Sequence, residues 1–258
     1  MSMMAFLNEI SQAWGGVMLA FARISVCFYI LPFLNKSVLI GAAARNSVIV
    51  IVIVGIWPMI AAPLPALDAI DLLFLGLKEA LVGLGMGMVL AMPFWVFHAM
   101  GAWIDNQRGA TISSSIDPLN GIDSTEMSNF LHLFCIVIFL ENGGMLNVIE
   151  AISDSYRLVG LLEWNGIDFN KCVQVIPRLI SKSLSLSAPI LLVLFLSEIL
   201  LGILSRFTPQ LNAFSISLGI KSVIALTVLL MYFVPLLSVQ IVELGRAGVA
   251  VELFNGVQ

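Results

Sequence analysis

The sequence predicts an all-α integral membrane protein. Its 258 residues are 60% hydrophobic and 11% charged, with a mean hydropathy of +1.04, whereas a soluble domain usually carries about 25% charged residues. The apolar residues form continuous runs that suit helices crossing a core of roughly 30 Å, rather than the alternation of a membrane β-barrel. A formal net charge of -4, with no basic cluster, argues against a nucleic-acid partner.

Six apolar segments predict the membrane-type helices. They lie near residues 13–34, 46–66, 80–104, 127–149, 183–204 and 222–242. The first segment is expected to be retained rather than cleaved, because Glu9 is the only charge before Arg23 and a signal peptide needs a basic start. The second segment reaches Trp57-Pro58, where proline should kink or end a helix.

The third and fourth segments contain glycines with positional meaning. Gly83 and Gly87 are four residues apart, which fits close helix–helix contact in a membrane, although glycine is also generally frequent in membrane helices. The run Glu141-Asn142-Gly143-Gly144 predicts a bend or helix end inside the fourth segment. The amphipathic stretch 150–182 carries charges of both signs and is expected to be solvated or interfacial.

The fifth segment contains an isolated carboxylate, Glu198, among leucine and isoleucine residues. We expect Glu198 to be buried and to be protonated, paired across a subunit interface or turned to a lumen.

Lysine and arginine are almost evenly divided between alternate loops, so loop charge does not set an orientation. This balance is also compatible with hairpins that pack in a protein assembly without all crossing the bilayer.

No catalytic or metal-binding pattern is recognisable. The histidines His98 and His132 do not form an HExxH pair, and the three cysteines are scattered. The sequence also lacks a nucleophile elbow, a phosphate loop and a dinucleotide fingerprint. We therefore expect no enzyme activity, no cofactor and no metal, and His98 either faces a pore or is a satisfied structural histidine.

The most informative stretch is the polar block from Gly101 to Gly121. Its first polar residues are Asp105, Asn106, Gln107 and Arg108, directly after an uncharged run that starts at Ala80. Small hydroxyl and turn-forming residues follow. One interpretation is a lumen-facing loop. The other is an ordinary turn between two spans, with Asp105 and Arg108 paired at helical i,i+3 spacing.

Two motifs carry a family resemblance. The blocks Asp105-x-Gln107-Arg108-Gly109 and Pro209-Gln-x-Asn212-x-Phe214, the latter followed by Lys221-Ser, resemble the T-type subunit of the type III secretion export gate. This family includes the flagellar R-type export protein, and the block forms look closer to its virulence branch. The resemblance implies a structural pore subunit that helps unfolded effector proteins cross the bacterial inner membrane.

The same resemblance implies partners and an internal division. The expected partners are the R-type and S-type gate subunits in a helical ring, the U-type switch protein, the inner rod and unfolded protein substrates. Residues 1–182 would be R-type-like and residues 183–258 an S-type-like hairpin. The alternative is a secondary transporter for a small solute or ion, with Glu198 and the break at Glu141–Gly143 at its midplane.

The resemblance also assigns residue roles. A loop at about 105–123 would plug the closed pore, through Asp105, Gln107, Arg108, Gly109, Thr111, Ser113, Ser114, Ser115 and Asp117. A second set is assigned to assembly: Pro209, Asn212, Phe214 and Lys221 come from the resemblance, and Glu198 is added because an isolated carboxylate in an apolar run needs a partner.

Overall fold

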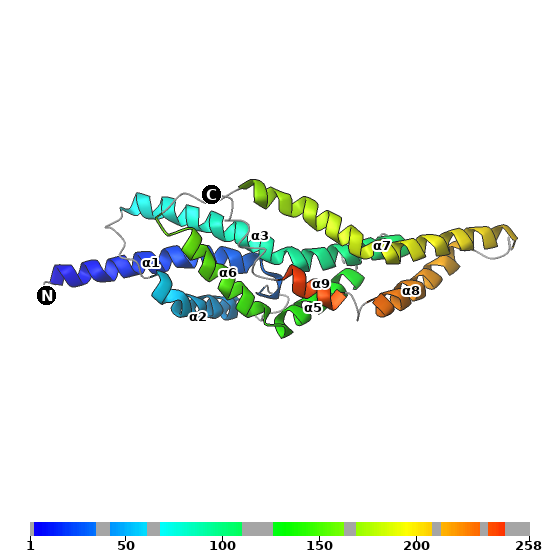
Figure 1. Ribbon diagram of the computed structural model, residues 1–258, viewed down its shortest axis with the longest axis horizontal. Coiled ribbons are helices and arrows are strands. Elements are labelled where there is room, and N and C mark those ends of the chain that lie inside the picture. The colour runs from blue at the N-terminus through cyan, green and yellow to red at the C-terminus, as the bar shows by residue number, and fades with distance from the viewer. Residues whose placement is uncertain are drawn as a thin grey trace, which may run out of the picture. The chain divides into compact units, whose positions relative to one another are not determined.

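The computed structural model describes residues 3–34, 42–60, 68–109, 126–162, 169–207, 213–232 and 237–245. No strand occurs in these ranges, which confirms the all-α prediction (Figure 1). The helices are α1 Met3–Ile30, the 3-10 turn η1 Pro32–Leu34, α2 Ala42–Ile60, α3 Ala69–Arg108, α5 Glu126–Glu141, α6 Gly144–Leu158, α7 Phe169–Phe207, α8 Ala213–Tyr232 and α9 Ser238–Leu244.

Two helices are long and apolar enough to cross a membrane over residues that the structure describes. Among the described residues, α3 and the Val173–Phe207 part of α7 qualify, and α5 with α6 adds a third only if the pair counts as one broken span. The described apolar parts of α1, α2 and α8, which are Trp14–Ile30, Ala42–Trp57 and Ile216–Tyr232, are shorter. Both long helices also extend beyond the predicted segments, because α3 begins at Ala69 and α7 at Phe169.

The stretch 150–182 is not one separate element. Residues up to Leu158 complete α6, and those from Phe169 onward belong to α7, which continues through Pro177 and Pro189. Glu150, Arg157 and Arg178 lie on these two helices and are exposed, as expected for a solvated stretch. α2 passes Pro58 and ends two residues later at Ile60, close to the predicted stop.

The chain forms two compact units, each built from separate stretches of sequence. The first unit comprises Met1–Met92, Gly143–Val175 and Gly245–Gln258, and the second comprises Pro93–Asn142 and Ile176–Leu244. The predicted boundary at 182/183 rests on likeness to two other subunits rather than on contacts. It falls inside the unbroken helix α7 and stays a prediction.

In the first unit, α3 packs directly on α1 through Gly83 and Gly87. A Cβ atom at Gly83 would collide with the backbone carbonyl of Arg23, and one at Gly87 would lie 3.2 Å from the Cα of Cys27. The close contact expected from the Gly-xxx-Gly spacing is therefore confirmed. α2 contacts both α1 and α6 in the same unit.

In the second unit, α5 packs along the last turns of α3. The ring of Phe94 meets that of Phe139 edge-on, with centroids 5.0 Å apart, and His132 Nδ1 lies 3.4 Å from the carbonyl oxygen of Phe94. The ring of His98 contacts that of His132 edge-on at 5.5 Å, which favours the structural interpretation of His98. α9 packs on α5.

The predicted helix break is confirmed. α5 ends at Glu141 and α6 begins at Gly144. Gly143 has φ 76°, the left-handed conformation that glycine adopts without steric penalty.

Candidate functional site

The first residues of the predicted plug are helical rather than loop. α3 continues through Asp105 and ends at Arg108, and the chain turns at Gly109, which has φ 81°. A cation in the last turn and an i,i+3 ion pair both favour helix here, which explains the error. Thr111, Ser113, Ser114, Ser115 and Asp117 lie outside the described residues, so their plug role stays a prediction.

Asp105 is buried, and both of its carboxylate oxygens are bonded. Its side chain is 0% exposed, and Oδ1 accepts a 2.7 Å hydrogen bond from Nε of Arg108 and lies 2.7 Å from Nη2 in the same ion pair. This is the i,i+3 pair that the sequence predicted. Oδ2 accepts a hydrogen bond of 3.0 Å from the backbone N–H of Met127, in the first turn of α5. Asp105 is therefore buried within the chain and joins the end of α3 to the start of α5, and its plug role stays a prediction.

Two further contacts hold the start of α5 on α3. Ser128 Oγ donates a 2.5 Å hydrogen bond to the carbonyl oxygen of His98. Gly101 approaches the backbone of Ser128 so closely that a Cβ atom there would collide with it. The spacing of His98, Gly101 and Asp105 places them on one face of α3, and this face receives α5.

A second polar group in the same unit joins three predicted site residues, Gln107, Glu198 and Lys221. Glu198 Oε2 lies 3.2 Å from Lys221 Nζ and accepts a 3.5 Å hydrogen bond from Gln107 Nε2. The side chain of Glu198 is 55% exposed and that of Lys221 is 9% exposed. The expectation that Glu198 is buried is thus not met within the chain, because the carboxylate pairs with Lys221 near the surface of α7.

The remaining predicted assembly residues are only partly described. Pro209 and Asn212 lie outside the described residues. Phe214 belongs to the first turn of α8, and its side chain is outside the described set. Their assembly role remains a prediction, as does the partner-facing role of Glu198.

Sequence reasoning missed a buried ionic cluster in the first unit, formed by Arg23, Lys78 and Glu79. Their side chains are 0–1% exposed. Arg23 binds both Glu79 oxygens, at 2.6 and 3.0 Å, and Lys78 Nζ lies 2.8 Å from Glu79 Oε1. This geometry is the bidentate arrangement that makes an arginine–carboxylate pair strong.

The excess positive charge of this cluster is directed at the end of α6. Arg23 donates to Ser155 Oγ at 3.1 Å and to the carbonyl oxygen of Val159 at 3.0 Å. Lys78 donates to the carbonyls of Gly160 and Leu161 at 2.8 and 2.9 Å. Carbonyls near a helix C-terminus lack intrahelical partners and carry partial negative charge, so the two cations satisfy them.

Tyr156 completes the cluster. The guanidinium of Arg23 lies 4.0 Å from the centre of the Tyr156 ring, a cation–π contact. Arg23 is a charge inside an apolar run, and such a charge needs a partner. That signal was available in the sequence, but Lys78 and Glu79 lie before the predicted start of the third segment and so were not considered as its partners.

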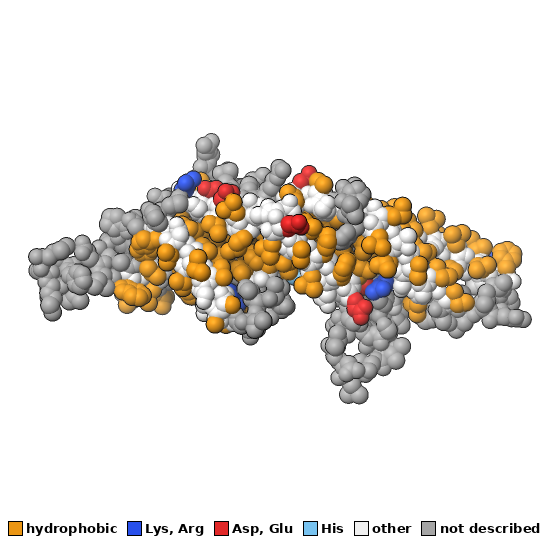
Figure 2. Space-filling model, turned by 90° about the horizontal axis from the view of Figure 1, so that it is seen from below, with side chains coloured by type: hydrophobic (Ala, Val, Ile, Leu, Met, Phe, Trp, Pro, Cys, Tyr) orange, Lys and Arg blue, Asp and Glu red, His pale blue; other side chains and the backbone are white. Residues whose placement is uncertain are grey.

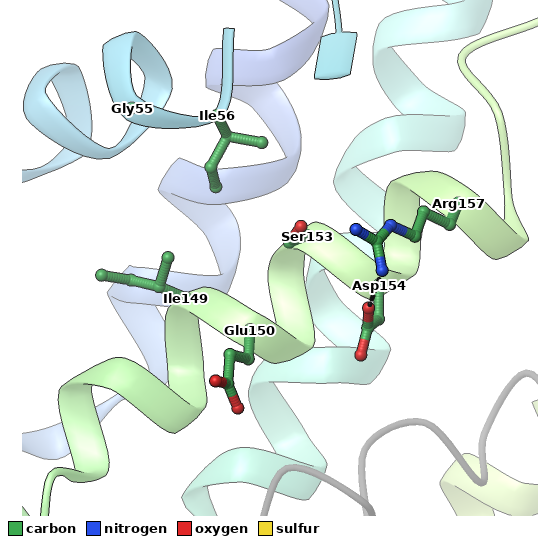
Figure 3. A pocket seen from close by; sticks show the side chains of 7 residues that line it. All are labelled: Gly55, Ile56, Ile149, Glu150, Ser153, Asp154 and Arg157. Carbon is green, nitrogen blue, oxygen red and sulfur yellow. Dashed lines mark hydrogen bonds and ion pairs between the residues drawn. The ribbon is translucent and has the colours of Figure 1, made fainter. Parts of the chain in front are cut away.

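A groove of about 430 Å³ lies between α2 and α6 in the first unit (Figure 3). Gly55 and Ile56 come from α2, and Ile149, Glu150, Ser153, Asp154 and Arg157 come from α6. Asp154 and Arg157 form an exposed ion pair at 3.4 Å on its rim. We assign no chemistry to this groove.

Comparison with known proteins identifies the family. Residues 14–245 match the family model described as "Bacterial export proteins, family 1". The chain belongs to this family. The chain is 44% identical over 247 residues to "Surface presentation of antigens protein SpaR" of Salmonella typhimurium, which covers 93% of this chain and 91% of that protein.

More distant relatives include both virulence and flagellar export proteins. "Yop proteins translocation protein T" of Yersinia pestis is 34% identical, covering 84% of this chain and 85% of the relative. "Flagellar biosynthetic protein FliR" of Bacillus subtilis is 27% identical, covering 87% and 88%. This member of family 1 is thus a T-type subunit of the type III secretion export apparatus. The transporter alternative finds no support among these relatives.

Proposed function

We propose that this family 1 protein is a pore-forming structural subunit of the export gate in the bacterial inner membrane, without a catalytic reaction of its own. It assembles with R-type and S-type subunits, contacts the U-type switch protein and the inner rod, and helps to conduct unfolded virulence effectors. Family membership supports the export role. The observation that carries the assembly role is the uncovered apolar surface of α7.

Only 28% of the most apolar window of α7 is buried within the chain, compared with 72% for α3. Leu192, Phe195, Leu196 and Leu200 are each more than half exposed. Figure 2 shows apolar side chains spread over much of the described surface on one face. Apolar patches of this size mark contact with lipid or other proteins. We infer that neighbouring gate subunits cover much of α7.

The plug role is proposed for the segment at about 105–123, which begins with the last turn of α3 and the turn at Gly109. Its small hydroxyl residues suit a barrier that must block ions and still yield to a passing polypeptide. Each hydrogen bond in such a barrier contributes about 0.5–1.5 kcal/mol, so many weak contacts can form and break singly.

Deletion of residues 110–116 tests the plug. The deleted chain, co-expressed with R-type and S-type subunits, should still co-purify with them, and the bacterial membrane should become leaky to small ions or dyes. An assembled gate that stays tight after the deletion would reject the plug assignment.

Purification of the undeleted chain tests the assembly role. A chain that purifies alone as a stable, protease-resistant monomer would argue against this role.

A further inference from the structure

We propose that Asp105 is a positioning residue that clasps both ends of the segment joining α3 to α5, and so sets where the plug segment starts and ends. This inference rests on the proposed plug function for its effect on permeability, but the clasp itself is a matter of contacts between described residues. The three elements involved are the last turn of α3, the turn at Gly109 and the first turn of α5.

The two carboxylate oxygens of Asp105 bind different partners. Oδ1 holds Arg108, the last residue of α3, through a hydrogen bond from Nε and an ion-pair contact with Nη2, each at 2.7 Å. Oδ2 holds the backbone N–H of Met127, the second residue of α5, at 3.0 Å. One fully buried carboxylate therefore binds the residues on both sides of the segment between Gly109 and Glu126.

The electrostatics favour this arrangement. The first N–H groups of a helix have no partner within the helix and carry partial positive charge, so an anion placed there acts as a cap. Asp105 caps α5 from a different helix, 22 positions earlier in sequence. The positive charge of Arg108 compensates the carboxylate, which is otherwise expensive to bury.

The approach of the two helices is independently fixed. Gly101 permits backbone contact with Ser128, and Ser128 Oγ is bonded to the carbonyl of His98. These contacts bring the α5 N-terminus within reach of Asp105, one turn further along the same face of α3. Closing the ends of a loop in this way lowers the number of paths that the intervening chain can take.

The test uses the assembled gate with Asp105→Ala and the neighbouring control Asn106→Ala, whose side chain is exposed. Two properties are measured in gates of equal subunit composition: hydrogen exchange of peptides covering residues 126–130, and membrane leakage of a small dye. Loss of the cap should speed exchange by about tenfold, as expected for a helix cap. Membranes that contain the Asp105→Ala gate should also leak the dye, and the Asn106→Ala gate should behave as wild type in both measurements.

The two measurements separate the clasp from the plug. Unchanged exchange at 126–130 in Asp105→Ala overturns the clasp, whatever the leakage. Faster exchange in a gate that remains tight supports the clasp and, together with a tight gate after deletion of 110–116, rejects the plug instead. If Asp105→Ala does not assemble, Asp105→Asn is measured in its place, because an amide has a single acceptor oxygen and cannot bind both Arg108 and the Met127 N–H. Exchange should then be faster than in wild type in peptides covering 105–109 or 126–130, and wild-type exchange in both overturns the clasp.

Discussion

The two units contain ionic groups of similar chemistry in opposite environments. In the first unit, Arg23, Lys78 and Glu79 are almost fully buried and bonded to one another and to the end of α6. In the second, Glu198 is 55% exposed and reaches Lys221 at 3.2 Å. The first group fixes the contacts of α1, α3 and α6. The second remains accessible on α7, where a neighbouring subunit can bind it.

This difference shows that a charge in an apolar helix is not by itself a functional marker. Arg23 and Glu198 look alike in the sequence, because each interrupts a run of apolar residues. Burial and the number of bonds separate the two, since a buried charge must be fully satisfied whereas an exposed pair contributes little to stability.

The largest effect is expected for Glu79→Gln. The variant keeps the shape of the side chain but leaves Arg23 and Lys78 as two buried cations without a counter-charge. Removing one partner of a buried ion pair costs about 3–5 kcal/mol. Unfolding of the purified gate in a denaturing detergent titration should therefore begin at a much lower detergent fraction. Glu150→Gln, on the exposed rim of the α2–α6 groove, is the control, and equal stability of the two variants would contradict the structural role of the cluster.

An intermediate effect is expected for Gly83→Ala in the same unit. The added Cβ would meet the backbone carbonyl of Arg23, so α1 and α3 must separate. Overpacking of this kind costs on the order of 1–3 kcal/mol. Gly76→Ala is a matched control in the same helix, because its Cβ meets nothing within 4 Å, and it should be neutral or stabilising by up to about 1 kcal/mol. The same detergent titration compares the two, and a Gly83→Ala gate as stable as Gly76→Ala would mean that the contact is not close.

The smallest effect on stability is expected for Glu198→Leu. Glu198 is 55% exposed, so solvent screens its pair with the buried Lys221, and the unfolding midpoint should shift less than in Glu79→Gln. If Glu198 contacts a partner, co-purification with R-type and S-type subunits or secretion of an effector should still fall. Arg157→Ala breaks a comparable exposed pair on α6 and controls for general effects of surface charge. Normal assembly and secretion in Glu198→Leu would remove the residue from the assembly set.

Local signals in the sequence predicted the local features of the fold. Gly143 indicated the end of α5, the spacing of Gly83 and Gly87 indicated a close helix contact without naming its partner, and the spacing of Asp105 and Arg108 indicated their ion pair. Each of these depends on residues within a few positions, for which helix geometry is sufficient.

The features that were missed depend on residues far apart in sequence. The partner of Arg23 is Glu79, 56 positions away, and the partners of Lys78 are carbonyls 82 and 83 positions away. A hydropathy reading ends a segment at a charge because it treats the charge as solvated. α3 includes Lys78 and Glu79 because α1 and α6 replace that solvation. The contact of Asp105 with Met127 was missed for the same reason.

The bonds between Arg23, Lys78 and the end of α6 also have a consequence for biosynthesis. A ribosome completes α1 and α3 before it reaches Ser155, so both cations and Glu79 are present before their carbonyl acceptors emerge. N-terminal elements tend to fold first during translation. α6 would then be bound as it is made, with one of the two positive charges already balanced by Glu79. Because the donors are made before the acceptors, the carbonyls at the end of α6 can be bonded as soon as they are synthesised. They are then not left unpaired in an apolar environment.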